Sequence, residues 1–300
     1  MIDLHLHTVF SDGKITDIEK IVQNCDVISI TDHNSIQACK FFADKLKGKK
    51  LIIGCEVTVD RAPDYLLYFP ENTYSDELEK AFEEIRIAEE GVIKQCYYNL
   101  GYNQWEKDIT VAFPQNQKVK NARTRDLAAI IHLYNTGLDY DNGNFDFGDL
   151  KIARKQRWTY ADSIGNPVPE DIAFEIADRF AGKLVLAHPI HTAIKRCPRD
   201  NTTSTLIVEK LNSLLKAFVN KGGKYLEWEY FSEEHIGKYE LTMDDLTEIR
   251  CIITDVAEKN GLQYTIGTDS HSLDGYDNAI KWLKENESII QSNLATWIEE

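Results

Sequence analysis

The first residues of the chain alternate strictly between hydrophobic and polar side chains, in Ile2-Asp3-Leu4-His5-Leu6-His7. This alternation is typical of a β-strand whose two faces meet different surroundings. Apolar segments predict further strands at 27–31, 51–59, 184–187, 225–230 and 264–268. Helical patterns lie between or after them, at 17–24, 36–46, 205–220, 242–260 and 277–286. Such alternation over short links predicts an α/β fold with parallel strands and crossover helices.

The middle of the chain interrupts this rhythm. Residues 71–181 are mostly helical in pattern, at 76–99, 124–135 and 170–181, with polar or aromatic loops between. Three or four strands come before this segment and three after it, which fits a (β/α) barrel of about seven strands interrupted once. We therefore expect a barrel built from residues 1–70 and 182–300. The insertion at 71–181 is expected to pack beside it as a lid over the active site.

Charge and composition narrow the function. The 300 residues carry 34 basic and 49 acidic side chains, a net charge of −15, which disfavours binding to long nucleic acid or anionic lipid. No apolar run is long enough to span a membrane, and the N-terminus lacks the pattern of a signal peptide. The six cysteines are scattered without a CxxC pair. These features predict a cytoplasmic protein that acts on a small molecule, and leave the oligomeric state open.

The placement of the histidines is the most informative feature. Of the eight histidines, five lie at the carboxyl end of a predicted strand: His5, His7, His33, His188 and His271. The carboxylates Asp12, Glu56 and Asp269 lie at similar places. In a parallel barrel these strand ends converge on one face. Imidazole and carboxylate are the ligands of zinc, iron and manganese, and a shared carboxylate can bridge two ions.

Each motif also has an ordinary explanation when it is taken alone. A His-x-His pair on a strand is more often structural than a metal site, Asp269 would serve as a helix cap, and Glu56 as an ion-pair partner. Several such sites at the strand ends of one alternating chain are hard to explain by chance. Together they predict a metal centre.

The same residues resemble a known family. The ordered series Asp3-Leu4-His5-Leu6-His7-Thr8, Ser11-Asp12-Gly13, Thr31-Asp32-His33, Gly54-Cys55-Glu56, Ala187-His188-Pro189 and Gly267-Thr268-Asp269-Ser270-His271 looks like that of the polymerase and histidinol phosphatase (PHP) family. It is most similar to the nucleoside-phosphate phosphatase branch. The resemblance implies a distorted (β/α)7 TIM-like barrel that binds two or three Mn, Fe or Zn ions and hydrolyses phosphoesters.

The resemblance also implies which residues hold the ions. His5, His7 and Asp269 would hold one metal, and Glu56 would bridge it to a second that His188 also binds. A third would be held by Asp12, His33 and His271, with Asp32 behind them orienting a ligand. Similar proteins carry a further histidine after the bridging glutamate, where this chain has Asp64-Tyr65-Leu66-Leu67-Tyr68-Phe69. Either Asp64 replaces that histidine as a ligand, or the second metal is weakly held or absent.

The implied chemistry is attack of a metal-activated hydroxide on phosphorus, which needs no Ser or Cys nucleophile. The expected substrate is a small phosphomonoester, with a nucleotide among the candidates. Residues considered for binding it are His191, Lys195, Arg196, Arg123, Arg125, Glu227 and His235. The general acid for the leaving group is not predicted.

Three other functions compete with this one. A phosphodiesterase acting on oligonucleotides or cyclic phosphates would share the metal centre. An amidohydrolase-type C–N hydrolase also begins with His-x-His, but it leaves Asp12 and the Thr31-Asp32-His33 motif unexplained. A non-catalytic metal-binding domain is favoured only by the missing histidine near Asp64.

Overall fold

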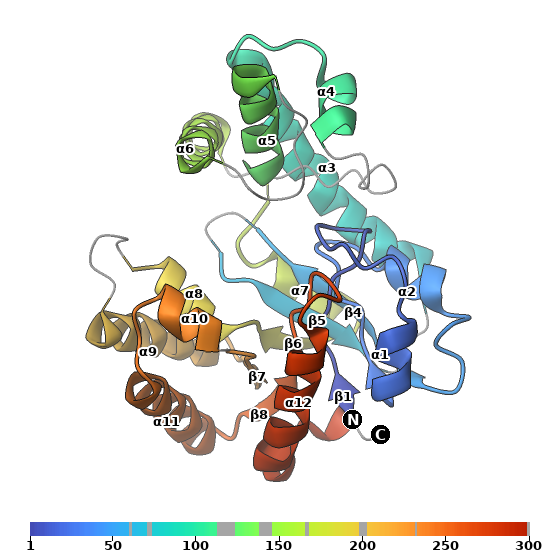
Figure 1. Ribbon diagram of the computed structural model, residues 1–300, viewed down its shortest axis with the longest axis vertical. Coiled ribbons are helices and arrows are strands. Elements are labelled where there is room, and N and C mark those ends of the chain that lie inside the picture. Colours follow the sequence, from blue (N-terminus) through green and yellow to red (C-terminus); the bar gives the residue numbers. More distant parts are fainter. Residues whose placement is uncertain are drawn as a thin grey trace.

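The computed structural model describes residues 1–59, 62–70, 74–112, 124–137, 146–165, 168–197, 203–231 and 233–298. Within these ranges the strands form two sheets, one of order β1-β2-β3 and one of order β4-β5-β6-β7-β8 (Figure 1). The bounds of the strands are β1 Ile2–Asp3, β2 Val27–Ile28, β3 Lys50–Leu51, β4 Ile53–Val57, β5 Tyr65–Phe69, β6 Lys183–Leu186, β7 Tyr225–Trp228 and β8 Gln263–Ile266.

Backbone hydrogen bonds join the two sheets at both edges. Only Ile52 separates β3 from β4, and its N–H donates to Ile28 O at 2.9 Å. On the other side Leu4 N donates to Ile266 O at 3.0 Å, which ties the chain after β1 to β8. The sheets therefore enclose a TIM-like core. The described residues form eight strands, or seven if β3 and β4 are counted as one. The expected number of seven therefore stays a prediction.

One strand runs against the predicted direction. β5 is antiparallel to both β4 and β6, with Tyr65 opposite Val57 and Leu186. The link between β4 and β5 is too short for the crossover that parallel neighbours need. As a result β5 begins where β4 and β6 end, and Asp64, just before β5, lies at the carboxyl ends of its neighbours. An all-parallel barrel would have placed Asp64 at the opposite end.

Helices cover the outside of the sheets (Figure 1). They are α1 Glu19–Asn24, α2 Gln37–Phe42, α7 Ile172–Arg179, α8 Pro189–Lys195, α9 Ser204–Asn220, α10 Glu233–Lys238, α11 Met243–Asn260 and α12 Tyr276–Ile290. Their apolar sides join one large core, as with Leu211, Leu215 and Phe218 on α9. Thr242 and Asp245 form a capping box that starts α11. Two 3-10 turns, 291–293 and 296–298, end the described chain.

The inserted segment divides between two cores. Its helices are α3 Asp76–Asn99, α4 Trp105–Ala112, α5 Thr124–Thr136 and α6 Phe147–Ile164, followed by α7. The first half of α3, with Leu78 and Phe82, and α7, with Ile176, belong to the barrel core. The second half of α3 packs with α4, α5 and α6 around Trp105 in a separate core, which lies at the top of Figure 1.

Several helices escaped the sequence analysis. α6 has few buried apolar side chains, and α4, α8 and α10 are short, so none has a strong helical pattern. In the part of the chain described, no helix combines the length and apolarity required to cross a membrane.

Candidate metal centre

Three groups of imidazole and carboxylate side chains meet at the carboxyl ends of the strands. Within each group the potential ligand atoms all lie within 4.8 Å of one another. The groups in the described chain are His5, His7 and Asp269; His7, Asp12, His33 and His271; and Glu56, Asp64 and His188. His7 belongs to two of them.

The first group joins the two ends of the chain. His5 Nε2 and His7 Nε2 lie 3.1 Å apart, and both lie close to Asp269 Oδ1, at 3.3 and 3.2 Å. His5 and His7 follow β1, and Asp269 follows β8, next to β1 in the fold. The three atoms face a common point.

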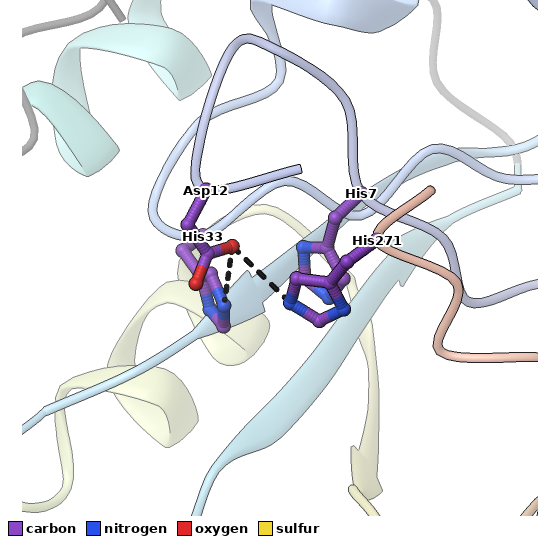
Figure 2. Close-up of side chains that lie close together, drawn as sticks. All are labelled: His7, Asp12, His33 and His271. Carbon is purple, nitrogen blue, oxygen red and sulfur yellow. Dashed lines mark ion pairs between the residues drawn. The ribbon is translucent and has the colours of Figure 1, made fainter. Parts of the chain in front are cut away.

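The second group is centred on Asp12, in the loop after β1. Asp12 Oδ1 lies 3.3 Å from His33 Nε2 and 3.2 Å from His271 Nε2 (Figure 2). The imidazole of His7 stacks against both rings, with ring centroids 4.4 Å from His33 and 4.3 Å from His271. Four side chains from three separate segments therefore face one another.

The third group depends on the antiparallel β5. His188 Nε2 lies 2.9 Å from Glu56 Oε1 and 3.7 Å from Asp64 Oδ2. Asp64 thus lies beside Glu56 and His188, and its role as a ligand stays a prediction. Lys195 Nζ lies 3.4 Å from Asp64 Oδ2.

Glu56 links the three groups. Its Oε2 lies 2.9 Å from His33 Nδ1, 3.2 Å from His7 Nε2 and 3.6 Å from His5 Nε2. Yet this buried oxygen accepts no hydrogen bond of normal geometry from the described residues. An oxygen aimed between several imidazoles, without a well-oriented donor, is what a bridging carboxylate of a metal centre requires.

The imidazoles of His5, His7 and His271 are oriented by the protein at Nδ1 and present Nε2 to the carboxylates. Nδ1 of His5 lies 2.6 Å from Glu227 Oε1, and Nδ1 of His271 lies 3.0 Å from Asp269 O. Ser11 Oγ lies 3.5 Å from His7 Nδ1 and donates to Asp32 Oδ1 at 2.5 Å. Holding one ring nitrogen in this way fixes the tautomer that leaves the other free to bind a metal. The donor set fits borderline divalent metals such as zinc, iron and manganese.

Close packing of these groups shifts pKa values in opposite directions. Burial disfavours the charged form of His7, but Asp269 and Glu56 outweigh it and raise the pKa of His7 to about 10. Burial is likewise outweighed by Glu56 at His188, whose pKa rises to about 9. Burial would raise the pKa of Glu56, but the imidazoles of His33 and His188 hold that pKa well below its usual range. Protonated imidazoles thus supply the positive charge that bound cations would otherwise supply.

Two residues of these groups have unusual backbone conformations. His188 has φ of 24° and Asp269 has φ of 50°, a region that residues other than glycine rarely adopt. Hydrogen bonds hold both in place, from His188 N to Glu227 Oε2 at 2.6 Å and from Asp269 N to His5 O at 2.7 Å. Such strain is concentrated at functional sites, where the surrounding structure enforces it.

Glu227 was a candidate for contacting the substrate, but its side chain lies behind His5 and His188. Its side chain is buried, and its two oxygens are occupied by His5 Nδ1 and the N–H of His188. The reason is that Glu227 points inward from β7, behind His5, so it orients two potential ligands. The sequence does not reveal this partnership, because 222 residues separate Glu227 from His5.

Asp32 is buried behind the groups and contacts Thr8 and Ser11. It accepts hydrogen bonds from Thr8 N at 2.7 Å, Thr8 Oγ1 at 2.6 Å and Ser11 Oγ. Asp32 orients His7 indirectly, because the Ser11 hydroxyl that donates to Asp32 also lies beside His7 Nδ1. The motif Ser11-Asp12-Gly13 contains Ser11, but no local sequence pattern indicates its contact with Asp32.

The predicted substrate residues lie in several places. Arg125 Nη1, on α5, lies 2.7 Å from Asp12 Oδ2, so the inserted segment touches the second group. His191 pairs through Nδ1 with Glu229, a residue that sequence analysis missed, and its ring lies 5.0 Å from that of His235. Arg196 is exposed at the end of α8. Arg123 lies outside the described residues.

An α/β fold with imidazoles and carboxylates gathered at the carboxyl ends of its strands is typical of metal-dependent hydrolases. The family model of the PHP domain matches residues 3–295, so the chain belongs to the PHP family. A similar solved structure is an amidohydrolase from Chromobacterium violaceum, described with bound sulfate and no metal. It is 17% identical, with a TM-score of 0.55, over 91% of this chain and 88% of that chain. This likeness shows the fold alone. A comparison with curated proteins finds no match.

Proposed function

We propose that this protein is a metal-dependent phosphoesterase that hydrolyses a small phosphomonoester. The observation that carries the proposal is the convergence of three donor groups on Glu56, in a chain of the PHP family. Three adjoining groups offer room for two or three divalent ions. Ions bound there would lower the pKa of water and neutralise the charge of phosphoryl oxygens.

The residues of this chain have distinct tasks in the proposal. Eight would hold the ions: His5, His7, Asp12, His33, Glu56, His188, Asp269 and His271. Asp64 completes the group that contains His188. Glu227, Ser11 and the carbonyl of Asp269 keep imidazoles in the required tautomer. Lys195, beside Asp64, is the cation best placed to meet an anionic substrate at the third group.

The second group distinguishes phosphoester hydrolysis from C–N hydrolysis. A C–N hydrolase of the amidohydrolase type needs the groups around His5, Glu56 and His188, but gives no task to Asp12 and His33. Here Asp12 lies 3.3 Å from His33 and 3.2 Å from His271. A third ion at this position would help to bind a phosphate with several charged oxygens. The net charge of −15 supports a small substrate over long nucleic acid, and we propose the cytoplasm as its compartment.

The test is phosphate release from a panel of phosphorylated compounds by protein purified with Mn²⁺. The panel contains nucleoside monophosphates and bisphosphates, histidinol phosphate, sugar phosphates and a chromogenic diester. Bound metal is counted in the same sample, and a His7→Ala variant serves as the control. We expect phosphate release that a chelator inhibits and that the His7→Ala variant no longer shows. Bound metal without release from any compound would contradict the proposal, and release from the diester alone would move it to a phosphodiesterase.

A further inference from the structure

A large groove opens beside the metal centre. It has a volume of about 940 Å³ and includes Asp269 and His271 in its wall. From there it extends along α11 and α12, past Tyr230, Arg250 and Trp282. A molecule whose phosphate lies at Asp269 and His271 would therefore have space for the rest of its body in this groove.

Arg250 is a half-buried cation in the wall of this groove. It lies on α11, and its guanidinium carbon is 5.4 Å from the centre of the Trp228 ring. Trp228 is itself fixed, because its Nε1 donates to Asn286 Oδ1 at 2.9 Å. This cation–π contact places the guanidinium beside a fixed ring in the groove wall.

One nitrogen of the guanidinium has no hydrogen-bond partner in the described part of the chain. Nη2 of Arg250 is buried and finds no hydrogen-bond acceptor among the residues described. Burial lowers the pKa of Arg250, and the charge of Glu229 only partly opposes this effect. A buried donor on a charged group is costly when left unsatisfied, so an anion in the groove would stabilise it.

A second cation in this wall, Lys281 on α12, has a different setting. Lys281 is largely exposed and lies 4.0 Å from Glu285 on the same helix. The aromatic rings of Tyr230 and Trp282, 5.1 Å apart, form an apolar part of the wall. The groove therefore combines aromatic rings with the Arg250 guanidinium, in a wall that also contains the carboxylates Asp274 and Glu285.

We propose that Arg250 binds a second oxyanion of the substrate, a carboxylate or phosphoryl group, at a distance from the phosphate that is hydrolysed. The groove then selects substrates with an anionic tail, and Arg250 determines that selectivity. The inference rests on the proposed function for the identity of the reacting group. It does not depend on that function for the binding of the tail.

The experiment compares alkyl phosphates that differ only at the far end of the chain. The tails are a carboxylate, a sulfonate and a neutral amide, each on a short series of chain lengths. Hydrolysis is measured with the Mn²⁺-loaded full chain. The wild type should prefer an oxyanion tail over the amide by about tenfold or more in kcat/KM, mainly through KM. In Arg250→Met, which keeps an apolar stem against Trp228, this ratio should fall to near one.

Two further variants and one binding measurement complete the test. Lys259→Met removes an exposed charge from the same helix and should keep the wild-type ratio. Arg250→Lys keeps the charge but not the planar fork, and should give an intermediate ratio. Binding of non-hydrolysable phosphonates with the same tails is followed by tryptophan fluorescence, and folding by circular dichroism.

The outcomes separate this inference from the proposed function. No tail preference in the wild type, or a preference that survives in Arg250→Met, would overturn the inference. If the wild type releases phosphate from no compound, the proposed function fails, and phosphonate binding alone decides the inference. An Arg250-dependent preference for oxyanion tails would then support it, and equal binding of all tails would overturn it.

Discussion

Glu227 Oε1 lies 2.6 Å from His5 Nδ1, on the side of the imidazole opposite the other potential ligands. The second oxygen of Glu227 accepts a hydrogen bond from the backbone of His188. One buried carboxylate therefore orients residues of two donor groups at once. A carboxylate behind a metal-binding histidine raises the basicity of the imidazole and fixes its tautomer.

Glu227→Gln should weaken metal binding without disrupting the fold. The amide has nearly the same shape but loses the negative charge, so we expect metal affinity to fall by about 10- to 100-fold. Titration calorimetry with Mn²⁺ or Zn²⁺ measures the change. Glu258→Gln, an exposed substitution on α11, is the control. Unaltered affinity in Glu227→Gln would mean that His5 does not hold a metal.

His7→Ala should remove more bound metal than the loss of any other histidine. His7 belongs to two of the three donor groups, whereas His188 belongs to one. Metal counted by atomic emission should therefore fall further in His7→Ala than in His188→Ala, and turnover should be abolished. His132→Ala, in the inserted segment and paired with Asp149, is the control for loss of a histidine. Equal metal content in all three variants would refute the assignment of His7.

Two variants of Asp64 test whether its carboxylate is a metal ligand. Asp64→Ala should reduce the metal held by Glu56 and His188, since His188 Nε2 lies 3.7 Å from the carboxylate. Asp64→His should restore that metal, because an imidazole at this position, just before β5, again offers a ligand atom beside Glu56 and His188. The readout is metal stoichiometry of the two variants after dialysis. If Asp64→Ala keeps the full stoichiometry, Asp64 is not a ligand.

Metal binding should release protons and weaken as the pH falls. The pKa of His7 is raised to about 10 and that of His188 to about 9 in the metal-free protein, so both carry protons at neutral pH. A metal must displace these protons, and lowering the pH favours the protonated form that competes with it. Calorimetry in buffers of different ionisation enthalpy measures the protons released at each pH. Binding that releases no protons at pH 7 would contradict the protonated state described here.

Gly267→Ala should disturb the first donor group. A Cβ at residue 267 would overlap the backbone N and the Cβ of His5. We expect a loss of stability on the order of 1–3 kcal/mol and weaker metal binding, because the overlap pushes His5 away from Asp269. Thermal unfolding and metal titration measure both effects. Gly91→Ala on α3, where a Cβ meets no neighbour, is the matched control and should not lower stability.

The sequence alone determined the chemical nature of the centre. His5, His7, His33 and His188 were identified because strand-forming patterns end at each of them, and the ends of parallel strands meet on one face. Helical patterns replace the alternation between residues 71 and 181, and the insertion predicted from them stays a prediction. These features are local, so short stretches of sequence carry them.

Only the tertiary structure decided which distant residues meet. Asp64 joins Glu56 and His188 because β5 runs antiparallel, and Glu227 lies behind His5 because β7 turns that side chain inward. Arg250 enters the groove wall through its packing on Trp228. Such partnerships depend on strand direction, register and helix packing across the whole fold. Those are set by contacts between segments far apart in the chain, and a local pattern does not record them.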